Sequence, residues 1–190
     1  MTRREVPGGV RFITFSCERR LPLLGSPDAR DLFARSLREA RDRLSFKLLA
    51  WVAMPEHTHL LLIPPDGSPL APVLKSLKLS IQQRVLRFLR HSGDPLASEI
   101  VRADGATRFW QKGGGFDRNV REQTELNKAI RYTHHNPVAR GLVAAPLDWR
   151  WSSARWWFAR QRSHEQDPAD VPCDWPPGDP RAWAMWEGYV

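Results

Sequence analysis

The chain has 190 residues, with 29 Lys or Arg against 21 Asp or Glu, and its formal net charge is +8. A hydrophobic share of 42% can build one core, which excludes a wholly disordered chain. Two cysteines, Cys17 and Cys173, are too few for a disulfide scaffold or a cysteine metal knuckle. The longest apolar run, residues 48–54, is too short to span a membrane. We expect a cytoplasmic protein with no signal peptide and no membrane partner.

Charge and aromatic residues are unevenly distributed. Residues 1–149 carry 24 Lys or Arg and 15 Asp or Glu, whereas residues 150–190 carry 5 and 6. Seven of the nine tryptophans lie between residues 149 and 186. We therefore expect a basic domain at 1–150 and an aromatic, proline-rich tail at 151–190. A basic body suits a polyanion such as nucleic acid, although the same charge could simply keep a protein soluble.

Sequence periodicity predicts alternating strands and helices. Strands are expected at 10–17, 46–54 and 57–63, helices at 27–43 and 70–91, then a short strand within 108–121 and a helix from 119–122 to about 136, ended by Pro137. This order is that of the split βαβ motif. We predict an α+β fold, a ferredoxin-like sandwich whose antiparallel sheet has its helices on one face, followed by the tail.

Two histidines two residues apart form the first candidate site. His57 and His59 lie in a predicted strand, where side chains two apart point to the same face. Imidazoles so placed suit one metal ion, because histidine is the commonest metal ligand. Paired histidines on a strand are also common as plain surface or packing residues, so the spacing alone does not decide.

The second candidate site lies on the predicted helix near residues 122–136. Tyr132 and Asn136 are four residues apart and share a face, with Lys128 one turn earlier. Tyr132 could equally be an interfacial aromatic whose hydroxyl reaches water, and Asn136 before Pro137 could be a plain helix stop.

Four motifs in order resemble the HUH single-tyrosine transposases. Residues 54–62 (MPEHTHLLL) are similar to the MPNHxHLL strand of that family, and residues 110–121 to its WQ…F/YDR.IR stretch. Residues 132–143 (YTHHNPVARGLV) resemble its YIxxNPVxAGLV helix end, and residues 151–153 its WSS. The later motifs are those of the REP-associated tyrosine transposase branch. The resemblance covers about residues 8–157.

The resemblance implies a role for each matching residue. His57 and His59 would be metal ligands, Asn136 the third ligand, and Tyr132 the nucleophile. It implies a metal-dependent enzyme that cuts and rejoins single-stranded or hairpin DNA, such as REP-like palindromes, through a 5′-phosphotyrosine. Mixed nitrogen and oxygen ligands favour Mn²⁺ or Mg²⁺ as the cofactor.

Three departures from the family pattern are visible. Thr58 replaces a bulky apolar residue, residues 113–115 (GGG) replace a short turn, and Thr133 stands where the family has Ile. None of these changes removes a candidate catalytic group.

Basic residues near the motifs are the candidate DNA contacts. They are Lys75, Lys78, Arg87 and Arg90 on the predicted helix 70–91, Lys112, Arg118 and Arg121 in the motif at residues 110–121, and Lys128 on the predicted helix that follows. The alternative for any one of them is an ordinary solvated charge. Aromatic residues of the tail could stack on bases or pack back onto the body, and monomer or homodimer is left open.

Two other functions remain open at this level. A non-catalytic nucleic-acid-binding module would use the same fold, although the RNA-recognition signature is absent. A metal-dependent hydrolase would use the histidines and a water, although no HExxH motif is present. A covalent protein–DNA adduct would distinguish a transposase from both.

Overall fold

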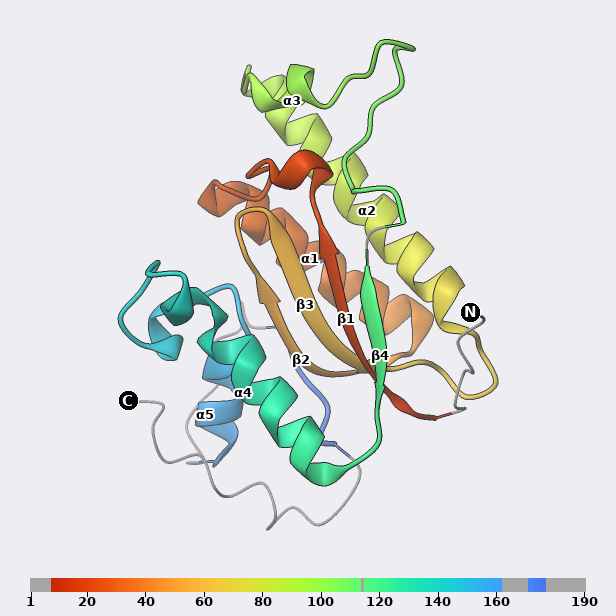
Figure 1. Ribbon diagram of the computed structural model, residues 1–190, viewed down its shortest axis with the longest axis vertical. Helices are drawn as coiled ribbons and strands as arrows, with labels where there is room; N and C mark the ends of the chain where they lie inside the picture. Colours follow the sequence, from red (N-terminus) through yellow and green to blue (C-terminus); the bar gives the residue numbers. More distant parts are fainter. Residues whose placement is uncertain (1–7, 114, 162–170, 177–190) are drawn as a thin grey trace.

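The computed structural model describes residues 8–113, 115–161 and 171–176 (Figure 1). Its elements are β1 Val10–Ser16, the short 3-10 turn η1 Glu18–Arg20, α1 Pro27–Leu44, β2 Lys47–Ala53, β3 His57–Ile63, α2 Leu70–His91, α3 Leu96–Glu99, β4 Phe116–Val120, α4 Gln123–Ala139, the 3-10 turn η2 Pro146–Asp148 and α5 Ala154–Gln161. Among the described residues, no helix is both long and apolar enough to cross a membrane.

The four strands form one antiparallel sheet in the order β2-β3-β1-β4. β1 lies at the centre, paired with β3 through Thr14 and His59 and with β4 through Phe12 and Arg118. The two βαβ halves therefore interlock as the sequence order predicts, and the α+β, ferredoxin-like class is confirmed.

The helices cover both faces of the sheet, which corrects the expectation of one covered face. Phe33 of α1 stacks on Trp51 of β2, and Nζ of Lys78 of α2 lies 4.8 Å from the Phe15 ring centroid. Tyr132 of α4 instead contacts Phe12, which lies three residues before Phe15 on β1. Successive residues of a strand face opposite sides, so α1 and α2 cover one face and α4 the other (Figure 1). Every residue of β3 is accordingly buried.

Helix α4 passes through Pro137 instead of stopping there. It ends at Ala139, where Gly141 adopts a positive φ of 67°. The backbone N–H of Leu142 donates to the carbonyl of Pro137, which closes the last turn. Proline removes one backbone donor, but the left-handed glycine, not the proline, ends this helix.

The segment after α4 pairs with the free edge of β2. The backbone N–H of Ala53 donates to the carbonyl of Trp151, and that of Ser153 to the carbonyl of Trp51, both at 2.9 Å. Trp157 is buried and its indole N–H donates to the carbonyl of Leu49. These described tail residues pack on the body, as one of the two sequence alternatives expected; Trp183 and Trp186 lie outside the described residues.

Candidate active site

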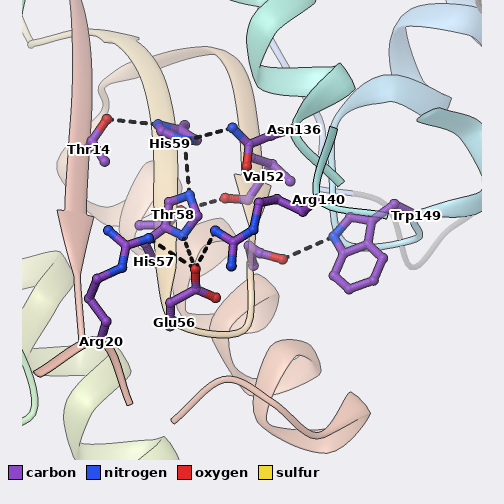
Figure 2. A network of polar contacts seen from close by, with 11 residues as sticks. Thr14, Arg20, Val52, Glu56, His57, Thr58, His59, Asn136, Arg140 and Trp149 are labelled. Atoms are coloured by element: carbon purple, nitrogen blue, oxygen red, sulfur yellow. Dashed lines mark hydrogen bonds and ion pairs between the residues drawn. The ribbon is translucent and has the colours of Figure 1, made fainter. Parts of the chain in front are cut away.

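Strand β3 presents the two motif histidines on one face. His57 and His59 are both buried, and their Nε2 atoms lie 3.1 Å apart. Thr58 between them points to the other face, where its hydroxyl donates to the carbonyl of Val52 at 2.7 Å. The strand alternation therefore brings the two imidazoles together as predicted, and the unusual Thr58 is satisfied by the backbone (Figure 2).

Each histidine is oriented by a polar partner at its other ring nitrogen. Nδ1 of His57 lies 3.1 Å from Oε1 of Glu56, and Nδ1 of His59 lies 2.7 Å from Oγ1 of Thr14. An ionised carboxylate only accepts, so Nδ1 of His57 carries the hydrogen and Nε2 keeps its lone pair. Partners of this kind set the tautomer and direction of metal-binding histidines.

Burial keeps both rings neutral. It lowers the pKa of His59 to about 3, with a further contribution from His57. Burial also lowers the pKa of His57, partly offset by Glu56. Although burial alone would raise the pKa of Glu56, the His57 ring and the Arg140 guanidinium bring it below its usual value. The site therefore offers neutral imidazoles beside an ionised carboxylate.

Helix α4 brings Tyr132 and Asn136 to this pair. Asn136 is buried, and its amide nitrogen lies 3.2 Å from Nε2 of His59. The Tyr132 ring centroid is 5.2 Å from that of His59, and its side chain is 53% exposed. Thr133 turns the other way into the core, where its hydroxyl donates to the carbonyl of Ala129. The four predicted site residues thus meet at one point.

The donor set fits a divalent cation. With Nδ1–H of His57 donating to Glu56 and Asn136 donating to His59, two Nε2 lone pairs face each other, which is unfavourable without a proton or cation. Two ligand atoms bound at about 2.1 Å to one ion, roughly at right angles, lie about 3 Å apart. Within the described ranges no group of three His, Cys, Asp or Glu could hold a metal. A cation here would need the Asn136 amide, turned so that its oxygen faces the histidines.

An open cavity of about 410 Å³ lies over these residues. Its lining includes five side chains that the sequence analysis did not single out: Phe12, Thr14, Arg20, Phe116 and Arg140. Phe116 on β4 is 55% exposed and meets Phe12 edge to face at 6.4 Å. Alternation along β1 could have indicated Phe12. No local pattern identifies Arg20 and Arg140, which lie 120 residues apart.

The predicted basic residues fall into two groups. Lys75, Lys78, Arg87 and Arg90 lie on α2, which covers the face of the sheet opposite the histidines. Lys78 is half-buried over Phe15, and its burial lowers its pKa. The helix has the predicted bounds, 70–91. Its four charged residues, however, lie on the helix that covers the opposite face of the sheet, away from the cavity.

The other four basic residues lie along β4, its approach and α4. Cζ of Arg118 lies 5.4 Å from the ring centroid of Phe12, a residue that lines the cavity, so Arg118 lies beside the cavity. Arg118 also forms an ion pair with Glu125. Lys112, Arg121 and Lys128 are exposed, the last of them one turn before Tyr132.

Comparisons with known proteins agree with the motifs. No family model matches the chain. The REP-associated tyrosine transposase of Escherichia coli (strain K12) is 24% identical over 151 residues, which are 80% of this chain and 79% of that protein. The putative REP-associated tyrosine transposase of Haemophilus influenzae (strain ATCC 51907 / DSM 11121 / KW20 / Rd) is 23% identical over 147 residues, 77% of this chain and 80% of that one.

A solved structure has the same fold. It is described as a REP-associated tyrosine transposase bound to a REP hairpin, and it matches with a TM-score of 0.64 at 22% identity, over 92% of this chain and 91% of that chain. The resemblance inferred from the four motifs is thereby confirmed.

Proposed function

We propose that this chain, a relative of the REP-associated tyrosine transposases, cuts and rejoins single-stranded or hairpin DNA through Tyr132. The relatives support a transposase-like, DNA-processing function. One observation carries the finer proposal: an exposed phenol stands over a buried pair of neutral histidines, on the same helix face as Asn136. We assign this activity to a domain at 1–150.

Tyr132 supplies the nucleophile. Its phenol oxygen forms a bond to the phosphorus of a DNA phosphodiester, while the bond from phosphorus to the 3′ oxygen breaks. The phenol proton is lost to solvent, and the leaving 3′ oxygen gains a proton. The products are a 5′-phosphotyrosine and a free 3′-OH, which can reverse the step on another strand. The number of ester bonds is conserved, so no nucleotide cofactor is required.

His57, His59 and Asn136 would hold a divalent cation, Mn²⁺ or Mg²⁺, next to this phenol. Such a cation acts as a Lewis acid that stabilises charge on phosphate oxygens. Glu56 and Thr14 keep the two rings oriented with Nε2 toward the cavity. Burial lowers the pKa of both histidines and so keeps them unprotonated.

The DNA partner is proposed to be a hairpin with a single-stranded flank. The solved relative is described as bound to a REP hairpin. In this chain, Arg118 lies over Phe12 at the cavity, and Lys128 lies on α4 one turn before Tyr132. The exposed ring of Phe116 offers a surface for an unpaired base. The charges on α2 would serve DNA that extends past the other face.

The test is covalent capture of DNA. Purified protein is incubated with Mn²⁺ or Mg²⁺ and labelled hairpins with single-stranded flanks, taken from palindromes near the gene, and the products are separated on denaturing gels. We expect an adduct resistant to denaturant with the unmodified protein, and none with Tyr132→Phe or with a chelator.

The matched control is Tyr189→Phe, because Tyr189 is the only other tyrosine and undergoes the same chemical change. An adduct that persists in Tyr132→Phe would move the nucleophile elsewhere. Cleavage without an adduct would favour a metal-activated water. DNA binding without cleavage would favour a non-catalytic binding module.

A further inference from the structure

The buried carboxylate of Glu56 gathers two arginines at the rim of the cavity. Its Oε1 accepts from Nη1 of Arg140 at 2.8 Å and from Nη2 of Arg20 at 3.1 Å. The same oxygen lies 3.1 Å from Nδ1 of His57. Figure 2 shows both guanidinium groups converging on this carboxylate beside the histidine pair. Three chain segments, η1, the start of β3 and the end of α4, meet here.

This cluster has more positive than negative charge. Glu56 carries one negative charge and faces two guanidinium groups, so with neutral histidines the net charge is +1. The side chains of Arg20 and Arg140 remain 54% and 49% exposed, and both line the cavity. Each guanidinium has five N–H donors, of which one is used on Glu56 in the contacts above. The remaining donors are available to an anion in the cavity.

The backbone holds Arg20 in a strained conformation. Its φ is 54°, a left-handed conformation that is unfavourable for a residue with a Cβ. The turn is tied down because the N–H of Arg20 donates to the carbonyl of Cys17, and the N–H of Cys17 donates to the carbonyl of Glu56. Strain of this kind persists where the surroundings enforce it, often at binding sites. Here it directs a guanidinium to the cavity.

We propose that Arg20 and Arg140 form a phosphate clamp that binds the non-bridging oxygens of one DNA phosphate in the cavity. Their two donors to Glu56 share one acceptor atom, so the two groups are close enough to reach the same phosphate. Planar guanidinium forks match phosphate oxygens, and Glu56 pre-orients them before DNA arrives. The clamp rests on the proposed function, because that function brings a phosphate to this cavity.

The test measures coupling between the two arginines and a single phosphate. The background is Tyr132→Phe in EDTA, so that DNA stays uncut and the readout is independent of a cation. A series of hairpins carries one neutral methylphosphonate at successive positions of the single-stranded flank. We expect one position to weaken binding by about tenfold or more, the size expected when a charge-assisted hydrogen bond is removed. Adding Arg20→Gln and Arg140→Gln should weaken binding to unmodified DNA similarly and reduce the methylphosphonate effect to within about twofold.

Three comparisons make the result decisive. Arg102→Gln removes the same charge from an exposed loop residue and should leave the methylphosphonate effect intact. The double variant Arg20→Lys, Arg140→Lys keeps both positive charges beside Glu56 but lacks the planar guanidinium groups. Its affinity for unmodified DNA should lie between that of the Tyr132→Phe background and that of the Gln variant. A full methylphosphonate effect in the Gln variant, or unchanged affinity, would overturn the clamp. The adduct assay tests the proposed function separately. An adduct without this coupling would contradict only the clamp, and coupling without an adduct would contradict only the proposed role of Tyr132.

Discussion

The hydroxyl of Ser153 lies 2.7 Å from Nε2 of His134 and joins α4 to the edge of the sheet. The same hydroxyl accepts the backbone N–H of Trp51 on β2 at 2.9 Å. His134 and Ser153 are both buried. Since α4 carries Tyr132 and Asn136, this contact helps to position the candidate nucleophile over β3. The WSS segment, residues 151–153, thus has a structural role in linking α4 to the sheet.

Ser153→Ala should destabilise the protein by about 1–3 kcal/mol. It leaves His134 and the N–H of Trp51 buried without this partner, and a buried polar group that loses its hydrogen bond costs about that much. Urea unfolding followed by circular dichroism measures the change. Ser98→Ala, at an exposed position, is the control and should stay within about 0.5 kcal/mol. Equal stability of the two variants would contradict the linking role of Ser153.

Replacing a candidate ligand should abolish divalent-cation binding. His59→Ala removes a buried imidazole that faces both His57 and Asn136, so titration calorimetry with Mn²⁺ should show no binding. Glu56→Ala leaves all three ligands but frees the His57 ring, and should weaken affinity about 10–100-fold. The control is His91→Ala at the exposed end of α2. Full Mn²⁺ binding by His59→Ala would place the cation elsewhere.

Stability should fall as pH drops below about 6.5. Burial lowers the pKa of His134 from 6.5 to about 3 in the folded chain, so only the unfolded chain takes up this proton between those values. The free energy of unfolding therefore rises with pH in this window, by up to about 1.4 kcal/mol per pH unit for one proton. Urea midpoints measured across this acidic range give the slope.

His134→Gln removes this one titrating group. The slope of the free energy of unfolding against pH should then become shallower by up to about 1.4 kcal/mol per pH unit, the contribution of one proton. His91→Gln, at the exposed end of α2, is the matched control with the same substitution. Identical pH slopes for His134→Gln and the unmodified protein would show that His134 is not the group responsible.

Phe116→Ala should weaken binding of a single strand by about 1–3 kcal/mol, the usual contribution of one base stacked on an aromatic side chain. Because Phe116 is 55% exposed, the free energy of unfolding should change little. Fluorescence anisotropy with labelled flanked hairpins measures affinity. Leu79→Ala, another exposed apolar side chain but on α2, controls for the removal of apolar surface. Equal affinities for both variants would exclude stacking at Phe116.

The α2 charges make a separate electrostatic prediction. Replacing Lys75, Lys78, Arg87 and Arg90 by Ala should flatten the slope of log affinity against log salt by about 0.7 for each DNA phosphate that these side chains neutralise. The measurement is a salt titration of hairpin binding. Because α2 covers the face opposite the cavity, an unchanged slope would restrict the DNA to the α4 side of the sheet.

Local sequence patterns accounted for most elements and for the core of the site. Strand alternation placed His57 and His59 on one face, and helical spacing placed Tyr132 and Asn136 together. The helix at 70–91 and the strand at 57–63 have the predicted bounds. Pro137 misled the prediction because the helix end depends on Gly141, whose left-handed backbone closes the last turn.

By itself, the sequence determined the directions of side chains within each strand and helix, because periods of about 2 and 3.6 residues act over a few neighbours. Only the tertiary structure decided that α4 covers the face opposite α1 and α2, and that Arg20 and Arg140 meet on Glu56. These relationships depend on many weak contacts between distant segments and on a strained turn held by its surroundings. No local period encodes such contacts, so the sequence could indicate the candidate nucleophile while the fold assembled the cavity around it.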